Sequence, residues 1–467
     1  MLTFTLDSTL PRPLYEQLYA QIRRDIASGV LRPGEKLPSK RALSAHLKVS
    51  MSTVEGAYGQ LLAEGYLRSE AKRGYFVQAL EPLAPQTPPA APPAPVPAAA
   101  PSPRLRYDFS TGAVDAGHFP FATWAKLMRQ VLTREDSRLL SAIPPQGVPE
   151  LQEAIAGYLH DFRGVTARPE QVVVGAGSEY LTSLLFQLLG REGGYAVEDP
   201  GYPKVQKILA HQGALVCPIP MDGQGMRVDA LRWSGARVAH VTPSHQFPLG
   251  TVMPVARRQE LLRWASEAPG RYVIEDDYDS EFRYAGRPIP ALQSLDEAGR
   301  VVYLSTFAQS LAPSLRIGFL VLPPHLLERY RRDFLFYAST VPSFEQHTLA
   351  RFLAEGHFER HVARMRLEYR GRMEALRSCA QTCGVPCALS GGEAGLHLLL
   401  GLEDPRSEGE LVELARRAGV GLYPLSDYYF AQPPADYHTT LVMGFARIRA
   451  GDMADSFRLL RQAWINE

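Results

Sequence analysis

The chain has 467 residues, of which 45% are hydrophobic and 21% charged, and a formal net charge of +1. This length predicts two or three domains, and the composition is that of a soluble globular protein. The sequence contains no run of about 18 apolar residues that could span a membrane. Because the first residues lack the layout of a signal peptide and four cysteines are too few for a disulfide framework, we expect a cytoplasmic protein.

The near-neutral total conceals an uneven distribution of charge. Residues 1–78 hold eleven Lys and Arg against seven Asp and Glu, a local charge of +4, which leaves −3 for the remainder. A basic bias confined to this first segment is compatible with nucleic-acid binding.

The first 78 residues predict three helices followed by a hairpin. Pro13 opens a helix that Gly29 ends, and Ser39 can cap a second. After the short break Lys48-Val49-Ser50, a third helix is expected over Ser50–Leu62. Two short helices around so tight a turn are typical of a helix-turn-helix, with Ser50–Leu62 as its recognition helix. Two wing strands are expected next, at Tyr66–Arg68 and Gly74–Val77, joined by Ser69–Arg73.

This segment resembles the GntR winged helix along PLYEQLYAQIRRDIASGVLRPGEKLPSKRALSAHLKVSMSTVEGAYGQLLAEGYL. The resemblance implies that the segment binds double-stranded operator DNA. The alternative is that its polar residues form only the solvated faces of a small helical domain. The residues that the resemblance implies as phosphate or base contacts are Lys40, Arg41, Ser52, Thr53, Lys72 and Arg73.

Residues 79–106 read ALEPLAPQTPPAAPPAPVPAAAPSPRLR and contain ten prolines. Such a segment favours an extended, polyproline-like tether without a core of its own. A ligand for a proline-binding domain is the weaker alternative. We therefore divide the chain into a head (1–78), a linker (79–106) and a body (107–467).

The body alternates strand-like and helical stretches, which predicts an α/β fold with a mostly parallel sheet covered by helices. One long helical segment is expected over Glu345–Arg377. Strands at Gly395–Leu400 and Leu441–Phe445 suggest a smaller terminal subdomain of α+β type. The strands expected in the large sheet are Gln171–Val174, Ala214–Ile219, Val238–Val241, Tyr272–Ile274, Val301–Leu304 and Ile317–Val321.

The body resembles fold-type I aminotransferases, in the version found in MocR-type regulators of the GntR family. The matching segments are DFSTGAVDAGHFPFATW, GAGSEYLTSLL, VEDPGYP, VTPSHQFPLGTVMP, YVIEDDYDSEFRYAGRP and STFAQSLAPSLRIG. The resemblance implies a homodimer and a site for pyridoxal phosphate (PLP).

Each implied cofactor contact has a chemical reason, beginning with the turn at Gly177, Ser178 and Glu179, which can present backbone N–H groups to a phosphate. Tight packing alone also explains many such turns. The resemblance implies that Asp276 pairs with the protonated pyridine nitrogen and that Arg316 clamps the phosphate. An ordinary buried ion pair is the alternative for these two. The remaining expected contacts are Tyr278 at the ring hydroxyl, Thr306 beside the phosphate, and Tyr202, His245 and Gln246 along the pocket wall. For Tyr202 and His245 a purely structural role is the alternative.

The decisive departure from the family is Gln309, which stands where the Schiff-base lysine is expected. A glutamine amide cannot condense with an aldehyde, because its nitrogen lone pair is delocalised into the carbonyl. No lysine follows Lys207, so no later residue can replace the missing amine. The sequence therefore predicts no catalytic residue, and any PLP is expected to bind without a covalent bond.

Two further departures concern neighbouring contacts. Relatives carry an aromatic residue, lent to the phosphate by the partner subunit, at the place of Ala142. Where an arginine for a substrate carboxylate is expected, His438–Phe445 has none, although Arg447 and Arg449 lie just beyond. The loss at Ala142 favours natural erosion of the site over an engineered change at Gln309.

Three of the four cysteines, Cys379, Cys383 and Cys387, are spaced four residues apart. Gly384 and Pro386 would break a helix between them, and small buried thiols are common. No metal site is predicted.

The leading hypothesis is a transcription factor whose body dimerises and senses a small-molecule effector. The alternative is a PLP-dependent aminotransferase with an accessory DNA-binding head. A third possibility is that the pocket has abandoned the cofactor.

Overall fold

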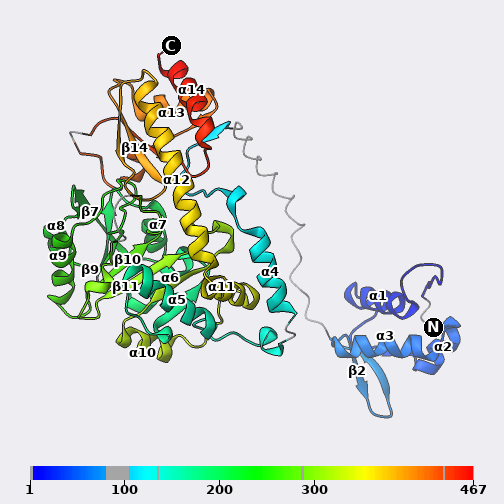
Figure 1. The fold of residues 1–467 in the computed structure, drawn as a ribbon. Coiled ribbons are helices and arrows are strands. Elements are labelled where there is room, and N and C mark those ends of the chain that lie inside the picture. Colours follow the sequence, from blue (N-terminus) through cyan, green and yellow to red (C-terminus); the bar gives the residue numbers. More distant parts are fainter. Residues whose placement is uncertain (1–3, 80–104, 134–135, 285–288, 435–436, 466–467) are drawn as a thin grey trace. The chain divides into compact units, whose positions relative to one another are not determined.

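A computed structural model describes residues 4–79, 105–133, 136–284, 289–434 and 437–465 (Figure 1). The chain divides into two compact units, Met1–Pro101 and Ser102–Glu467. Most of the predicted linker, residues 80–104, lies outside the described ranges. Among the described residues, no helix combines the length and the apolar character that crossing a membrane requires.

The first unit is a three-helix head with a small antiparallel sheet in the order β1-β3-β2. Its core is fully buried at Leu18, Ile22, Val54 and Tyr58. This core follows from the four-residue spacing of apolar side chains along the helices. The elements are α1 (Leu14–Ala27), β1 (Lys36–Leu37), α2 (Lys40–Leu47), α3 (Met51–Ala63), β2 (Leu67–Glu70) and β3 (Gly74–Val77).

The two predicted serine caps are present. Ser39 Oγ accepts a hydrogen bond from the Ala42 N–H at 3.2 Å, and Ser50 Oγ accepts one from the Thr53 N–H at 3.1 Å. Each cap satisfies an N–H group that the first helical turn leaves free. Ser50 therefore lies just outside the recognition helix, which begins at Met51.

Two details of the head differ from the sequence prediction. The first wing strand continues to Glu70, so that the turn of the wing is only Ala71–Arg73, with Lys72 in the left-handed region at φ 62°. Strand β1 was not predicted, because two residues are too short to show an alternating pattern.

In the described part of the body, eight strands form one sheet in the order β5-β12-β11-β10-β9-β6-β7-β8. Strand β12 runs antiparallel to both of its neighbours and β8 runs antiparallel to β7, whereas the other pairs are parallel. The predicted mostly parallel α/β sheet is confirmed, although β6 and β8 were missed. The strands are β5 (Val172–Gly175), β6 (Gly194–Asp199), β7 (Leu215–Asp222), β8 (Gly225–Met226), β9 (Ala236–Val241), β10 (Tyr272–Asp277), β11 (Val301–Thr306) and β12 (Gly318–Val321).

Helices cover both faces of this sheet (Figure 1). Val172, Val174 and Phe319 enter one hydrophobic core, whereas Val173 and Leu320 enter another. This alternation follows from the two-residue period of a strand, and it explains why the strands read as continuous apolar runs. The helices of this part are α4 (Phe121–Leu132), α5 (Pro149–Arg163), α6 (Ser178–Leu189), α7 (Pro203–His211), α8 (Val228–Trp233), α9 (Val255–Ser266), α10 (Pro324–Asp333) and α11 (Ser343–Ala354).

The single long helix predicted over Glu345–Arg377 is wrong. The chain forms α11 and then α12 (His357–Thr382), separated at Gly356, which has φ 70°. Only glycine adopts this conformation at little cost, so the helix ends there. The apolar pattern continues across the break, which explains the error.

Helix α12 belongs to both halves of the body. Phe358 and Val362 pack in a core of the large sheet, whereas Tyr369, Met373 and Leu376 pack in the core of the small subdomain. Figure 1 shows this yellow helix running between the two.

The small subdomain contains the antiparallel sheet β13-β14-β17-β16. The chain enters it through β4 (Tyr107–Asp108), which pairs in parallel with β15 (Val420–Gly421). The sequence prediction of a second, α+β subdomain is confirmed. Its other elements are β13 (Cys387–Gly391), β14 (His397–Leu402), β16 (Tyr423–Pro424), β17 (Thr440–Gly444), α13 (Glu408–Arg417) and α14 (Met453–Ile465).

Candidate functional site

A cavity of about 200 Å³ lies where the carboxyl ends of β10 and β11 meet the amino end of α6. Parallel strands end at one edge of a sheet, so residues far apart in the sequence converge there. The small subdomain closes one side of the cavity with Leu396 and His397. Eight of the sequence-predicted residues line it, namely Ser178, Glu179, Tyr202, Asp276, Tyr278, Thr306, Gln309 and Arg316.

One end of the cavity, here called the anion end, combines the amino end of α6 with the cationic side chain of Arg316. Gly177, with φ 83°, precedes α6, and the first N–H groups of a helix have no partner within the helix. A Cβ atom on Gly177 would lie 3.0 Å from the Arg316 guanidinium, so glycine lets this side chain lie against the turn. Arg316 Nη2 donates to the Ala176 carbonyl oxygen at 3.1 Å.

Two cations and one carboxylate meet at this end. Arg316 Nη2 lies 2.9 Å from Glu179 Oε2, and Lys204 Nζ lies 2.8 Å from Glu179 Oε1. The hydrogen bond from Lys204, aided by Arg316, lowers the pKa of Glu179, and the same bond raises the pKa of Lys204. Lys204 lines the cavity. The sequence analysis missed it because only residues after Lys207 were considered as replacements for the missing lysine.

The Thr306 hydroxyl is engaged within its own loop. It donates to the Ile317 carbonyl oxygen at 3.1 Å and accepts from the Ala308 N–H at 3.2 Å. The residue therefore lines the cavity, but in this structure its proton holds the turn between β11 and β12.

Asp276 presents a buried carboxylate to the cavity. Its Oδ2 lies 3.3 Å from His240 Nε2, on the neighbouring strand β9, whereas its Oδ1 has no hydrogen-bond partner among the described residues. A buried acceptor without a partner is rare and indicates a missing donor. A protonated ring nitrogen fits this oxygen. His240 was not predicted, because nothing in the sequence places β9 beside Asp276.

A second polar cluster supports Tyr278. His245 Nδ1 lies 3.0 Å from the Tyr278 hydroxyl and 2.9 Å from Asp279 Oδ2. His397 Nε2 donates to the Pro248 carbonyl oxygen at 2.9 Å, and burial lowers the pKa of His397 to about 3. His245, Asp279 and His397 offer metal-type ligand atoms within 4.8 Å of one another. Because His245 lies within hydrogen-bond distance of both Tyr278 and Asp279, we assign this pair to holding Tyr278.

The expectation that His245 and Gln246 line the pocket is wrong. Both residues are 2% exposed, and neither is among the residues that line the cavity. Gln246 Nε2 donates to the Pro200 and Phe247 carbonyl oxygens at 2.9 and 2.7 Å. Its amide therefore fixes the loop instead of facing a ligand.

Gln309 faces the cavity with a polar atom unused. Its Oε1 is buried and has no hydrogen-bond partner within the described ranges. An amide in this position can accept or donate a hydrogen bond to a ligand.

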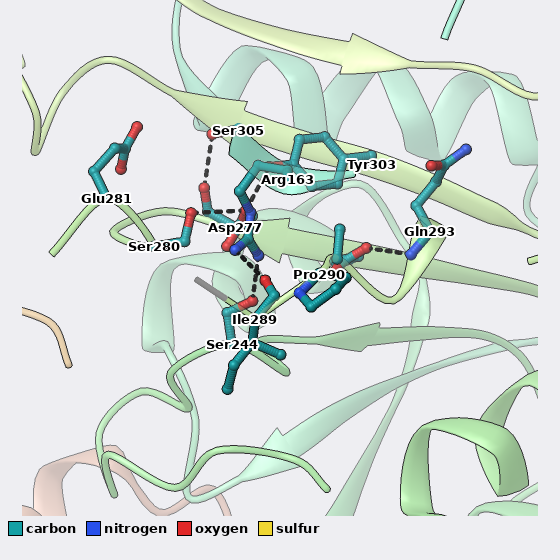
Figure 2. A network of polar contacts seen from close by, with 12 residues as sticks. Arg163, Ser244, Asp277, Ser280, Glu281, Ile289, Pro290, Gln293, Tyr303 and Ser305 are labelled. Carbon is teal, nitrogen blue, oxygen red and sulfur yellow. Dashed lines mark hydrogen bonds and ion pairs between the residues drawn. The ribbon is translucent and has the colours of Figure 1, made fainter. Parts of the chain in front are cut away.

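Behind Asp276, a buried ion pair fixes the end of β10 (Figure 2). Arg163, the last residue of α5, donates from Nε to Asp277 Oδ2 at 2.8 Å, and the two side chains are 4% and 1% exposed. The guanidinium also donates to Ser244 Oγ and to the Ile289 carbonyl oxygen, and the Tyr303 hydroxyl donates to Asp277. Successive strand residues face opposite sides, so this network holds Asp277 while Asp276 faces the cavity.

A larger, open cleft of about 1020 Å³ lies elsewhere in the body, along Asp222, Leu249–Val252 and Arg377. The residues that match a cofactor site do not converge there, so we place the candidate site in the smaller cavity.

In the head, the predicted DNA contacts lie at the starts of α2 and α3 and at the wing turn. Lys40 Nζ is 2.6 Å from Glu55 Oε1, and Arg73 is 2.6 Å from Glu70. The Ser52 and Thr53 hydroxyls each lie 2.8 Å from Ser50 Oγ. Arg41 and Lys72 are exposed.

Two family models match the chain. The model of bacterial regulatory proteins of the gntR family matches residues 14–77, and that of aminotransferase class I and II matches residues 107–431. The chain belongs to the GntR regulators with an aminotransferase body.

Several relatives match this chain over most of its length. The HTH-type transcriptional regulator YdeL of Bacillus subtilis is 39% identical, with 98% of both chains covered. The probable rhizopine catabolism regulatory protein MocR of Rhizobium meliloti is 35% identical over 98% of this chain and 95% of its own. The pyridoxine biosynthesis regulator PdxR of Corynebacterium glutamicum is 33% identical over 92% of this chain and 91% of its own.

Solved structures resemble the body of this GntR regulator. The kynurenine aminotransferase of Pyrococcus horikoshii has a TM-score of 0.67 and 23% identity, and covers 77% of this chain and 90% of its own. The α-aminoadipate aminotransferase LysN of Thermus thermophilus has a TM-score of 0.66 and 26% identity, with 77% and 92% covered. The fold-type I architecture is therefore confirmed.

Proposed function

We propose that the chain is a DNA-binding transcriptional regulator whose body binds PLP, or a related ligand, without a covalent bond. The winged head and the regulator relatives support DNA binding. The observation that carries the ligand part is a cavity lined by Asp276, Tyr278 and Arg316 with Gln309 in place of an amine. The proposed boundaries remain a head at 1–78, a linker at 79–106 and a body at 107–467.

The residues present fit PLP. Arg316 and the N–H groups at the start of α6 would hold its phosphate, and the free Oδ1 of Asp276 would accept from its ring nitrogen. Tyr278, held by His245, would contact the ring hydroxyl. When bound, the group supplies an aldehyde and an electron-withdrawing ring.

Neither Gln309 nor Lys204 is suited to form a Schiff base. Gln309 has no amine, and among the described lining residues Lys204 is the only lysine. Its Nζ lies 2.8 Å from Glu179, and this hydrogen bond raises the pKa of Lys204, which favours the protonated form of the amine. A protonated amine is not a nucleophile, and the Gln309 amide cannot act as the base for an α-proton. This favours a regulator over the aminotransferase alternative.

A homodimer would present two heads to two operator half-sites. An effector would then change operator affinity only as far as it binds the two arrangements of the protein unequally.

Titration of the purified full chain with PLP and pyridoxamine phosphate, followed by calorimetry and visible absorbance, tests the ligand proposal. We expect binding of the coenzyme, and no coenzyme mass retained on the polypeptide after borohydride treatment. Retained mass would refute the non-covalent mode, and turnover of a panel of amino acids would support the enzyme alternative. Absence of binding would favour a pocket that has abandoned the cofactor.

A further inference from the structure

The anion end of the cavity already contains an anion. Glu179, in the first turn of α6, bridges Arg316 and Lys204 at 2.9 and 2.8 Å. The three side chains are between 40% and 58% exposed, so a ligand can reach all of them. Two cations and one carboxylate leave a local charge of +1.

In this arrangement Glu179 competes with the phosphate group of the proposed cofactor. A phosphate group carries close to two negative charges at neutral pH and needs Arg316 as its counter-ion. Glu179 occupies the same guanidinium through its Oε2. Phosphate and Glu179 are like charges that compete for one cation, and like charges within a few ångströms repel.

The bridge also gives Glu179 a second partner. Its other oxygen is bonded to Lys204, so the carboxylate remains paired when Arg316 turns to a ligand. Removing Lys204 would leave Arg316 as the sole partner of Glu179 and would also remove one positive charge from the cavity.

We propose that Glu179 is a specificity-determining residue of this site, which holds Arg316 in the ligand-free protein and lowers the affinity for phosphate-bearing ligands. The inference rests on the proposed function, since it concerns the same cavity. It implies that the protein responds to a higher phosphate-ligand concentration than the same cavity with a neutral residue at position 179. It also implies that a ligand without a phosphate is unaffected by Glu179.

Three variants of the full chain test this. Glu179→Gln keeps the length of the side chain and removes its charge, and Lys204→Met removes the second partner. Glu192→Gln is the matched control, because it removes the same charge from a side chain that is 93% exposed and absent from the cavity lining. The probes are inorganic phosphate, PLP and pyridoxal, with dissociation constants measured by calorimetry and folding checked by thermal melting.

We expect Glu179→Gln to bind PLP and inorganic phosphate about five- to tenfold more tightly than the natural chain, the size of a partly screened charge contact. Lys204→Met should bind both about fivefold more weakly. Pyridoxal affinity should be the same in Glu179→Gln as in the natural chain, and Glu192→Gln should change nothing.

Equal or weaker phosphate binding by Glu179→Gln overturns the inference, even if PLP binds the natural chain as proposed. If PLP binds none of the proteins while Glu179→Gln gains affinity for inorganic phosphate, the inference stands and the cofactor proposal fails. If none of the proteins binds PLP or inorganic phosphate, both the inference and the cofactor proposal fail.

Discussion

At the scale of single residues, Gln309 decides what the cavity can do. Its amide differs from a lysine side chain chiefly in lacking a nucleophilic nitrogen. Because the rest of the cavity contains polar groups suited to PLP, the missing amine should be restorable by one substitution.

Gln309→Lys is expected to convert non-covalent binding of PLP into a covalent Schiff base. The measurement is the intact mass after borohydride reduction, with a visible absorbance band as a second signal. Gln309→Met, which has a similar length and no amine, is the control and should retain no coenzyme. If Gln309→Lys also retains none, position 309 does not face the aldehyde and the assignment of the site is wrong.

Sequence reasoning found the residues of this cavity that stand inside recognisable segments, such as Asp276 and Arg316. It missed Lys204 and His240, which directly adjoin two of those segments, and His397, which lies in a predicted strand of the small subdomain. These three become neighbours of the site only through the order of strands and the packing of the small subdomain. A residue's type and local pattern do not encode that proximity.

At the scale of elements, the ion pair between Arg163 and Asp277 connects α5 to β10. Both side chains are almost fully buried, so the removal of one partner leaves an uncompensated charge in the interior. The pair also fixes the strand end that carries Asp276.

Arg163→Met should lower the free energy of unfolding by about 3–5 kcal/mol, measured by urea denaturation of the full chain. Arg138→Met is the control, since Arg138 is 82% exposed and pairs with Asp136 at the surface. That change should cost at most about 1 kcal/mol. Similar losses in the two variants would show that the buried pair has no special role.

Glu281, just after β10, makes a second connection to α5. The Tyr158 hydroxyl donates to Glu281 Oε1 at 2.9 Å, and burial raises the pKa of Glu281 from 4.5 to about 7. Above pH 4.5 the unfolded chain releases this proton while the folded chain keeps it. The contribution of Glu281 to stability is therefore full at low pH and is lost as the pH rises towards 7.

Glu281→Gln should consequently melt at the same temperature as the natural chain at pH 4 and at a higher temperature at pH 8. The amide keeps the acceptor for Tyr158 and carries no charge to bury. Thermal melts at the two pH values measure this, with Glu297→Gln as the exposed control. A variant less stable at pH 8 would contradict the raised pKa.

Sequence patterns predicted most elements but not their limits. Strand β6 was missed because its apolar core, Tyr195–Val197, is only three residues long. Helices α11 and α12 were merged because their apolar spacing is continuous and only the backbone at Gly356 separates them. Long periodic segments are visible in a sequence, whereas short strands and single-residue breaks depend on tertiary contacts.

At the scale of the whole molecule, the head would contact DNA, and the proposed dimer of bodies would hold two heads together. The head has its own buried core, so we expect it to fold without the body. Two heads joined through a dimeric body would bind two half-sites as one unit, which raises the effective concentration of the second head.

The isolated head, residues 1–78, should therefore bind an operator selected with the full chain about 10²- to 10⁴-fold more weakly than the full chain does. Fluorescence anisotropy with labelled duplex at fixed salt measures both affinities. In the full chain, Arg41→Ala should also weaken binding. Equal affinity of head and full chain would argue against cooperation between two heads.

Helix α12 gives the body a mechanical property that neither subdomain has alone. Because α12 packs in both cores, we expect a tilt of the small subdomain to displace this helix relative to the large sheet. Residues of both subdomains, His397 and Asp276, line the cavity. A ligand that draws these two residues together is therefore expected to shift α12 relative to the large sheet.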